Sequence, residues 1–126
     1  MMSTGVDIVQ ISRIEKILKE KKDSFLTRIF TEKEIAYIKK KGNNPRTVAG
    51  LYASKEAISK ALGTGIGQVS WQDLEIIHDD KGKPLVNLSA KLDPMQDELK
   101  LDTLSLSISH DGDYAIAFVL GYHSAK

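Results

Sequence analysis

The chain contains no cysteine among its 126 residues. Disulfides and thiolate chemistry are therefore excluded, and a zinc site would have to use histidine and carboxylate ligands alone. No apolar run approaches the ~20 residues of a membrane-spanning helix, and the stretch MMSTGVDIVQ lacks the pattern of a signal peptide. These absences predict a cytoplasmic protein with no part in a membrane.

An excess of one charge is also lacking, since 18 Lys and Arg residues stand against 17 Asp and Glu residues. A net charge of +1 argues against a nucleic-acid-binding protein, although it does not exclude a local basic patch. The sequence shows no internal repeat, low-complexity segment or Pro/Gly/Ser-rich linker. We therefore expect residues 1–126 to form a single domain.

The order of expected elements indicates an α+β domain. The segment GVDIVQI (5–11) is rich in β-branched residues and apolar on both faces, which predicts a buried strand. Three helices are expected next, and capping-box spacing marks two of their starts, at Ser12 with Glu15 and at Thr31 with Glu34. The helices are expected at about 13–22, from Thr31 to a C-cap at Gly42, and at about 47–62; hairpins are expected at 71–77 with 84–88 and at 104–110 with 114–120, with a short helix from an N-cap at Asp93 to about Lys100 between them.

The third expected helix carries an unusual pair of charges. Its apolar stripe leaves Glu56 and Lys60 on roughly the opposite side, beside several alanines. Small residues there allow another chain segment or a ligand to approach closely. One interpretation is an ordinary i,i+4 ion pair on a solvated helix face, worth a few tenths of a kcal/mol. The other is a ligand site.

Asp7 lies within the first expected strand and shares a face with Val9 and Ile11. A buried carboxylate without a partner would cost several kcal/mol, so Asp7 should meet a cation, a metal or hydrogen-bond donors such as backbone N–H groups. If Asp7 and Glu56 converge on one hard cation, both placements are explained. Two carboxylates with several open positions are the ligand pattern of Mg²⁺ that serves substrate phosphates.

His110 ends the alternating run LSLSISH on its inward face, next to a turn. A histidine in this position is compatible with a structural role or with ligand binding. The loop GTGIG (63–67) has glycines that can offer backbone N–H groups to phosphates, and its pairing with His110 favours a phosphate site. The loop follows a helix C-terminus, so it is neither a Walker nor a Rossmann motif.

Segments along nearly the whole chain resemble the holo-acyl-carrier-protein synthases, the small 4′-phosphopantetheinyl transferases of bacterial lipid synthesis. The matching segments are GVDIVQISRI, FTEKE, AGLYASKEAISKALGTGIG, WQDLEI, DDKGKPLV and LSISHDGDYAIAFV. The most specific parts are the aspartate of the first segment, KEAISKALGTG and SISH. The resemblance implies a 4′-phosphopantetheinyl transferase-like fold, with mainly antiparallel strands packed with a long central helix.

The reaction implied by the resemblance moves the phosphopantetheine arm of coenzyme A onto a serine of apo-acyl carrier protein, releasing 3′,5′-ADP, in fatty acid biosynthesis. It implies Mg²⁺ as cofactor with Asp7 and Glu56 as its ligands, and Lys60 as a catalytic residue that neutralises the transferring phosphoryl group. Glu56 is also the candidate base for the serine, directly or through a water on the metal. Family members typically form homotrimers with sites at subunit boundaries.

For coenzyme A itself, the resemblance implies that His110 holds the nucleotide end. The other residues matching segments that line its site are Thr64, Gly65, Lys83 and Pro84. Two positions depart from the family pattern. Leu51 replaces the arginine of AGRFAAKEA, so Arg46, Lys40 or Lys41 would have to supply the lost phosphate contact. Asp111 follows SISH where threonine is more frequent, and its charge either favours a cationic contact by His110 or repels the ligand.

The first expected helix is rich in cations, and a carrier protein is acidic. We expect the carrier to dock on this basic helix, around Arg13, Lys21 and Arg28, with binding that weakens as salt rises. A merely solvated basic helix is the alternative. The rival functions are a transferase for polyketide or peptide carriers, a non-catalytic carrier- or nucleotide-binding module, and a Mg²⁺-dependent hydrolase of coenzyme A.

Overall fold

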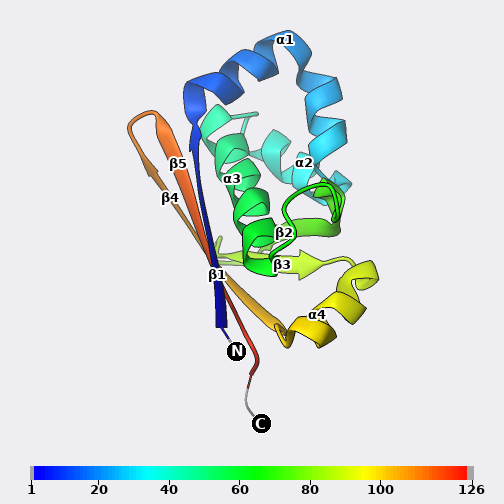
Figure 1. Cartoon of the computed structure of the whole chain (residues 1–126). Helices are drawn as coiled ribbons and strands as arrows, with labels where there is room; N and C mark the ends of the chain where they lie inside the picture. Colours follow the sequence, from blue (N-terminus) through cyan, green and yellow to red (C-terminus); the bar gives the residue numbers. More distant parts are fainter. Residues whose placement is uncertain (1, 125–126) are drawn as a thin grey trace.

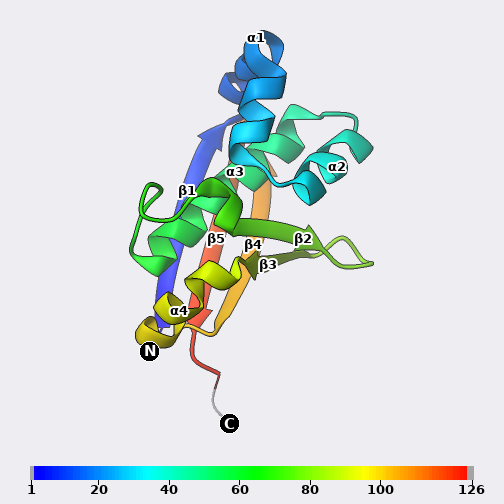
Figure 2. The ribbon, with the colours of Figure 1, turned by 90° about the vertical axis from the view of Figure 1, so that its right-hand side faces the viewer.

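The computed structural model describes residues 2–124, which form a three-stranded sheet, a two-stranded hairpin and four α-helices (Figure 1). The long helix α3 (Pro45–Leu62) runs through the middle, with the sheet on one side and the hairpin on the other (Figures 1 and 2). The predicted α+β class, with antiparallel strands around a long helix, is confirmed. The other elements are β1 (Met2–Gln10), α1 (Ile11–Ile29), α2 (Glu32–Lys40), β2 (Leu74–His78), β3 (Pro84–Leu88), α4 (Asp93–Leu99), β4 (Thr103–Asp111) and β5 (Tyr114–Tyr122), with 3-10 turns at Trp71–Asp73 and Ala90–Leu92.

The main sheet has the order β1-β5-β4 and is antiparallel throughout. Within the part of the chain that the structure describes, β1 pairs with β5 alone, so it is an edge strand, and α3 covers one of its faces. The prediction that this strand is buried on both faces was therefore wrong, since Val6 is 54% exposed and Ile8 57% exposed. The covered face carries Gly5, Asp7 and Val9.

Contact between β1 and α3 is unusually close at Gly5. A Cβ atom there would lie 1.9 Å from the carbonyl oxygen of Ala57 and 2.8 Å from the backbone nitrogen of Ala61. The alanines of α3 thus accommodate a strand of the same chain, which was one of the two options left open by the sequence. Because Asp7 lies two residues further along the same face, this contact brings its side chain against α3.

Helix ends follow the expected chemistry in part. The capping box at Thr31 is confirmed, since its hydroxyl accepts from the N–H of Glu34 and the Glu34 carboxylate accepts from the N–H of Thr31. The expected box at Ser12 is absent. The backbone N–H and hydroxyl of Ser12 instead donate to the Asp113 carboxylate, at 3.0 and 2.7 Å, from the turn between β4 and β5. A residue distant in sequence therefore caps α1, a pairing that sequence spacing does not reveal.

Several boundaries differ from the expected ones. α1 continues past Lys22 to Ile29 and is kinked at Lys21, whose φ of −144° and ψ of 44° are not helical. β2 begins at Leu74 rather than at Trp71, because residues 71–73 form a 3-10 turn. The expected caps each lie one position away: α2 has its C-cap at Lys41 with Gly42 following, and α4 has its N-cap at Leu92, so that Asp93 is already helical.

No helix within residues 2–124 is both long enough and apolar enough to cross a bilayer.

Candidate active site

A cavity of about 280 Å³ lies between β1, α1 and α3. Asp7 reaches it from β1, Arg13 from α1, and Glu56 and Lys60 from α3. The structure therefore brings together two acids that stand far apart in the chain. Tyr52 also lines the cavity, and sequence reasoning missed it.

Asp7 has Lys60 as its partner in this cavity. The Lys60 Nζ lies 3.2 Å from Asp7 Oδ1 and also donates to the carbonyl oxygen of Val6 at 3.0 Å. The Asp7 side chain is 19% exposed and that of Lys60 is 52% exposed, so the pair is at the edge of solvent. Such an exposed ion pair contributes at most about 1 kcal/mol, and a ligand can rearrange it at little cost.

Glu56 lies in an environment that disfavours its charge. Burial raises the pKa of Glu56 above its usual value, the negative charge of Asp7 raises it further, and Lys60 opposes both effects. The lysine thus leaves part of the repulsion between the two acids uncompensated. A cation bound between the carboxylates would remove this repulsion, which is the electrostatic condition for a divalent-metal site.

The carboxylates of Asp7 and Glu56 suit a metal ion most of whose coordination positions are filled by other ligands. Within the described residues, no three His, Asp or Glu side chains gather closely enough to hold a metal ion on their own. Two carboxylates leave positions for water and phosphate oxygens, as Mg²⁺ sites on phosphorylated substrates require. The ligand role of Asp7 and Glu56 stays a prediction to which this geometry is suited.

Tyr52 has a fixed ring at the mouth of this cavity. The ring packs between Phe25, at 6.0 Å between centroids, and Trp71, at 5.0 Å. Burial raises the pKa of Tyr52, and the charges of Glu56 and Asp7 raise it further. The phenol therefore stays neutral over the ordinary pH range and can donate a hydrogen bond.

His110 lies in a second cavity, of about 220 Å³. Its Nε2 lies 2.9 Å from the carbonyl oxygen of Arg46, and its ring packs so closely on Gly50 that a Cβ there would lie 3.2 Å from Nε2. Pro84 and Leu51 also line this cavity, so the predicted His110 and Pro84 come together. Arg46 contacts His110 through its backbone carbonyl oxygen, and its side chain does not line this cavity.

Two aromatic rings in the second cavity were not anticipated from the sequence. Tyr37 and His78 stack with their centroids 3.8 Å apart and their planes 4° from parallel. Burial lowers the pKa of His78, the nearby Lys41 lowers it further, and Asp79 opposes the shift. His78 is therefore a neutral aromatic surface at physiological pH rather than a cation. The sequence offered one signal for this ring pair, which was the isolated histidine at position 78, just before the turn DDKGK.

The GTGIG loop does not form the expected phosphate cradle. The backbone N–H groups of Thr64 and Gly65 both donate to the carbonyl oxygen of Ser59, and those of Gly63 and Gly67 are likewise used within the chain. The prediction of N–H groups free for phosphate was wrong for these four positions, because those of Gly63, Thr64 and Gly65 close the C-terminus of α3 and that of Gly67 donates to the carbonyl oxygen of Val69. Thr64 and Gly65 line neither cavity.

The expected pairing of His110 with the GTGIG loop is also wrong within one chain. His110 packs on Gly50, near the start of α3, whereas the loop begins at Gly63 beyond its end. At 1.5 Å per residue, these positions are about 20 Å apart along the helix. The two cavities share no lining residue, and their strands, β1 and β4, are the opposite edges of the sheet. Within one chain the predicted groups therefore form two separate half-sites.

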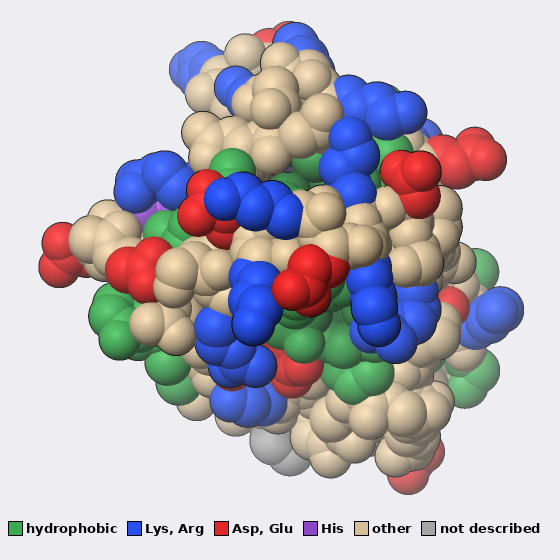
Figure 3. Space-filling model, turned by 90° about the horizontal axis from the view of Figure 1, so that it is seen from above, with side chains coloured by type: hydrophobic (Ala, Val, Ile, Leu, Met, Phe, Trp, Pro, Cys, Tyr) green, Lys and Arg blue, Asp and Glu red, His purple; other side chains and the backbone are tan. Residues whose placement is uncertain are grey.

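Basic side chains are numerous at the α1 end of the molecule, next to the first cavity. Figure 3 looks down on the α1 end of the molecule, where groups of Lys and Arg side chains alternate with fewer acidic ones. Arg13 lines the first cavity, and Lys21 and Arg28 line a neighbouring hollow that shares Tyr52 and Ile17 with it. The surface expected to bind the carrier protein is thus continuous with the first cavity, which contains Asp7 and Glu56.

The structure is a small α+β domain with paired carboxylates and a lysine beside a long central helix, and comparison with known proteins defines its class. The family model of the 4′-phosphopantetheinyl transferase superfamily matches residues 3–119. A holo-[acyl-carrier-protein] synthase of Caldanaerobacter subterraneus is 48% identical over 116 residues, which are 92% of this chain and 91% of that protein. The chain belongs to the 4′-phosphopantetheinyl transferase superfamily and, within it, to the holo-acyl-carrier-protein synthases.

Solved structures agree with this assignment. The holo-[acyl-carrier-protein] synthase of Helicobacter pylori in complex with coenzyme A matches with a TM-score of 0.83 and 42% identity, covering 94% of this chain and 98% of that one. The synthase of Bacillus anthracis in complex with CoA (3′,5′-ADP) matches with a TM-score of 0.79 and 39% identity, covering 98% of this chain and all of that one. The resemblance read from the sequence motifs is therefore confirmed.

Proposed function

We propose that the chain transfers the 4′-phosphopantetheine group of coenzyme A to a serine of apo-acyl carrier protein, with Mg²⁺, in cytoplasmic fatty acid biosynthesis. Family membership carries the class of reaction, and coenzyme A is bound in the structures of two relatives. The observation that carries the site is the meeting of Asp7 and Glu56, from β1 and α3, in one cavity beside Lys60.

The proposed chemistry is one in-line displacement at phosphorus. The serine oxygen forms a bond to the phosphorus that carries pantetheine, the bond from that phosphorus to the bridging oxygen breaks, and 3′,5′-ADP leaves with the electron pair. Asp7 and Glu56 would hold Mg²⁺, which neutralises negative charge on the diphosphate when bound. Lys60, now paired with Asp7, has the length and exposure to donate to the same phosphoryl oxygens.

Proton removal from the serine is assigned to Glu56. Glu56 lines the cavity that the serine must enter, and it would act directly or through a water on the metal. Tyr52, neutral and fixed between two rings, lies in the same wall and can donate a hydrogen bond to substrate oxygen. The nucleotide end of coenzyme A is assigned to the second cavity, with His110, Pro84 and the adjoining Lys83.

The same proposal includes a homotrimer whose sites lie between subunits. Two features support it: the half-sites lie at opposite edges of the sheet, and the sheet face away from α3 exposes an apolar group. Val6 stands opposite Phe118 and Ile8 opposite Ile116 in the register, so the four form one patch. A neighbouring copy that covers this patch buries apolar surface and brings a second cavity beside a first one.

One assay tests the proposal against its rivals. The protein is incubated with coenzyme A, Mg²⁺ and apo-acyl carrier protein, and the carrier is weighed by mass spectrometry. A mass gain equal to the phosphopantetheine arm is the expected result. Unmodified carrier with release of 3′,5′-ADP indicates a hydrolase, and bound but unmodified carrier indicates an inert module. Carriers of polyketide and peptide assembly, tested in parallel, distinguish the dedicated transferase.

A further inference from the structure

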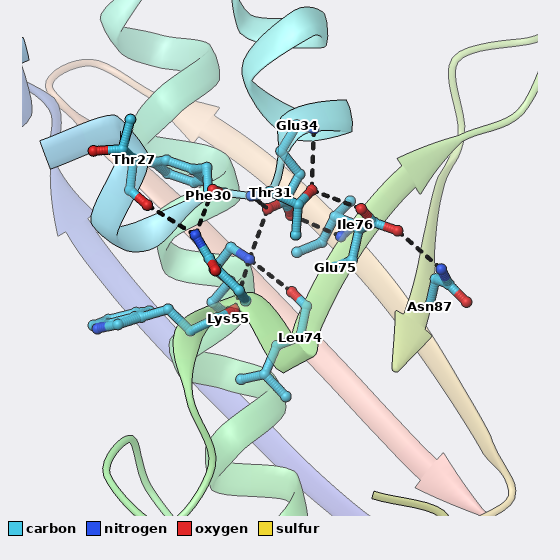
Figure 4. Close-up of polar contacts among 11 residues, drawn as sticks. Thr27, Phe30, Thr31, Glu34, Lys55, Leu74, Glu75, Ile76 and Asn87 are labelled. Atoms are coloured by element: carbon cyan, nitrogen blue, oxygen red, sulfur yellow. Dashed lines mark hydrogen bonds and ion pairs between the residues drawn. The ribbon is translucent and has the colours of Figure 1, made fainter. Parts of the chain in front are cut away.

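Glu34 and Lys55 form an ion pair in the interior of the protein. Lys55 Nζ lies 2.8 Å from Glu34 Oε1, and both side chains are 0% exposed (Figure 4). The pair lines neither of the two cavities, so the proposed chemistry does not use it. A fully buried ion pair is costly to desolvate and contributes little net stability, so its contacts must explain its presence.

Both side chains bind backbone groups of the 3-10 turn Trp71–Asp73 and of β2. Lys55 Nζ donates to the carbonyl oxygens of Trp71 and Leu74, each at 2.9 Å. The Glu34 carboxylate accepts from the backbone N–H of Ile76 at 2.8 Å, through Oε2. Glu34 also accepts a hydrogen bond from the backbone N–H of Thr31. The ammonium group of Lys55 therefore has three acceptors, and both oxygens of the Glu34 carboxylate have donors.

These bonds complete an edge of β2 that no strand covers. Among residues 2–124, β2 pairs with β3 alone, and the two strands form a sheet of their own. Along a strand, residues two apart direct their backbone polar groups to the same edge, so the Leu74 carbonyl and the Ile76 N–H belong to one edge. Glu34 and Lys55 supply the acceptor and the donor that a third strand would supply there.

The hairpin has few other anchors of this kind. The Gln72 side chain donates to the carbonyl oxygens of Thr27 and Phe30, and the Thr31 hydroxyl donates to Glu75 (Figure 4). The Gln72 and Glu75 contacts are exposed or part-buried, whereas the bonds of Lys55 to Leu74 and of Glu34 to Ile76 are buried, where a lost bond costs most. The ion pair thus supplies the buried polar attachment of β2 to α2 and α3.

The hairpin carries part of the second cavity. His78 from β2, Gly82 from the connecting turn and Pro84 from β3 line that cavity, together with Gly50 and Leu51 of α3. We infer that Glu34 and Lys55 are positioning residues that hold the β2–β3 hairpin at the distance from α3 that the nucleotide end of coenzyme A requires. This inference rests on the proposed function for the use of the cavity, and on the contacts of the pair for the attachment.

Lys55→Met tests the inference, because methionine keeps the length of the side chain and removes its three bonds. Glu34→Gln is the second variant, which keeps the shape and loses the charge. Val119→Ala is the control, a truncation in the buried face of β5 that has no contact with the hairpin in the bonds described above. Three quantities are measured: the dissociation constant of coenzyme A by calorimetry, kcat and KM, and hydrogen exchange of the amides of 74–88.

The expected result is a split between binding and chemistry. In Lys55→Met the dissociation constant and KM for coenzyme A rise about tenfold, whereas kcat of the folded enzyme changes by less than about threefold. The increase in amide exchange over the wild type is larger in residues 74–88 than in the rest of the chain. Val119→Ala lowers the thermal midpoint without this local change. If Lys55→Met does not fold, the same three quantities are compared for Glu34→Gln, in which a smaller change in the same direction is expected.

Two outcomes overturn the inference. Exchange in 74–88 that rises no more than in Val119→Ala shows that the pair does not attach the hairpin. Loosened hairpin amides with unchanged coenzyme A affinity show that the attachment has no bearing on coenzyme A. Failure of the proposed function is a separate result: the wild-type protein then leaves the carrier unmodified, while calorimetry and exchange still decide the role of the pair.

Discussion

At the scale of single residues, the site depends on two acids that repel each other. Burial and the charge of Asp7 hold the pKa of Glu56 high, and Lys60 is too exposed to cancel this effect. The arrangement leaves an electrostatic repulsion that the proposed divalent cation would relieve on binding. Ligand-free protein and metal-bound protein should therefore differ in stability and in their response to pH.

Asp7→Asn and Glu56→Gln each should lower turnover at limiting Mg²⁺ by about 100-fold or more, because each removes one of the two charged oxygen ligands. The carrier mass assay measures this rate. Glu98→Gln, an exposed acid of α4, is the control and should keep wild-type turnover. A wild-type rate in either site variant under limiting Mg²⁺ would remove the metal assignment.

The raised pKa of Glu56 also predicts a dependence of stability on pH. The folded, metal-free protein binds the Glu56 proton more tightly than the unfolded chain does. This contribution is present below the ordinary glutamate pKa and is lost as pH rises through the raised value. Glu56→Gln should therefore raise the thermal midpoint at about pH 8 and leave it unchanged at about pH 4. Equal shifts at both pH values, measured by calorimetry without Mg²⁺, would argue against the repulsion.

At the scale of elements, α1 connects the predicted docking surface to the cavity. Arg13 reaches the cavity itself, and Lys21 stands at the kink of the helix, beside the hollow that contains Arg28. The kink changes the helix direction, so the cations do not form one straight stripe. An acidic carrier that contacts both helical parts would place its serine near Tyr52, which belongs to both hollows.

Reversal of charge at Arg13 and Lys21, as the double variant R13E/K21E, should raise KM for the carrier by about tenfold or more while KM for coenzyme A changes little. Added salt should weaken carrier binding by the wild type and have less effect on the variant. The double variant K91E/K100E, which reverses two exposed cations in the 3-10 turn Ala90–Leu92 and just after α4, controls for the same change in net charge. Equal rises in both KM values would contradict a dedicated docking helix.

Local sequence signals were reliable where the partners are close along the chain. The capping box at Thr31 and Glu34 and the end of α3 at Gly63 were predicted correctly, because both depend on residues within one turn. The capping of α1 by Asp113 was missed, because its acceptor comes from the other end of the chain. The buried pair of Glu34 and Lys55 was missed for the same reason.

At the scale of the whole molecule, the proposed trimer makes a prediction about how the two cavities are used. In that trimer an active site combines Asp7 of one chain with His110 of a neighbouring chain, because β1 and β4 are opposite edges of one sheet. Mixtures of Asp7→Ala and His110→Ala chains, each inactive alone, should regain activity after subunit exchange, up to about one quarter of the wild-type rate for random pairing. No recovery, with mixed oligomers verified by native mass spectrometry, would place each complete site within one chain.

The sequence by itself determined the reaction class and the fold class, because motifs such as KEAISKALGTG and SISH and the periodicity of each segment are properties of neighbouring residues. It also determined which acids and which lysine to examine. The single-domain expectation stays a prediction.

Only the tertiary structure decided which of those residues meet. The close contact of Gly5 with Ala57 places Asp7 beside Glu56, and the course of α3 across the sheet puts His110 on the other side. The first three residues of the glycine loop do not offer N–H groups to phosphate, because these groups close the end of α3. Packing and hydrogen-bond partners over long sequence distances depend on how elements cross in space, which spacing along one chain does not encode.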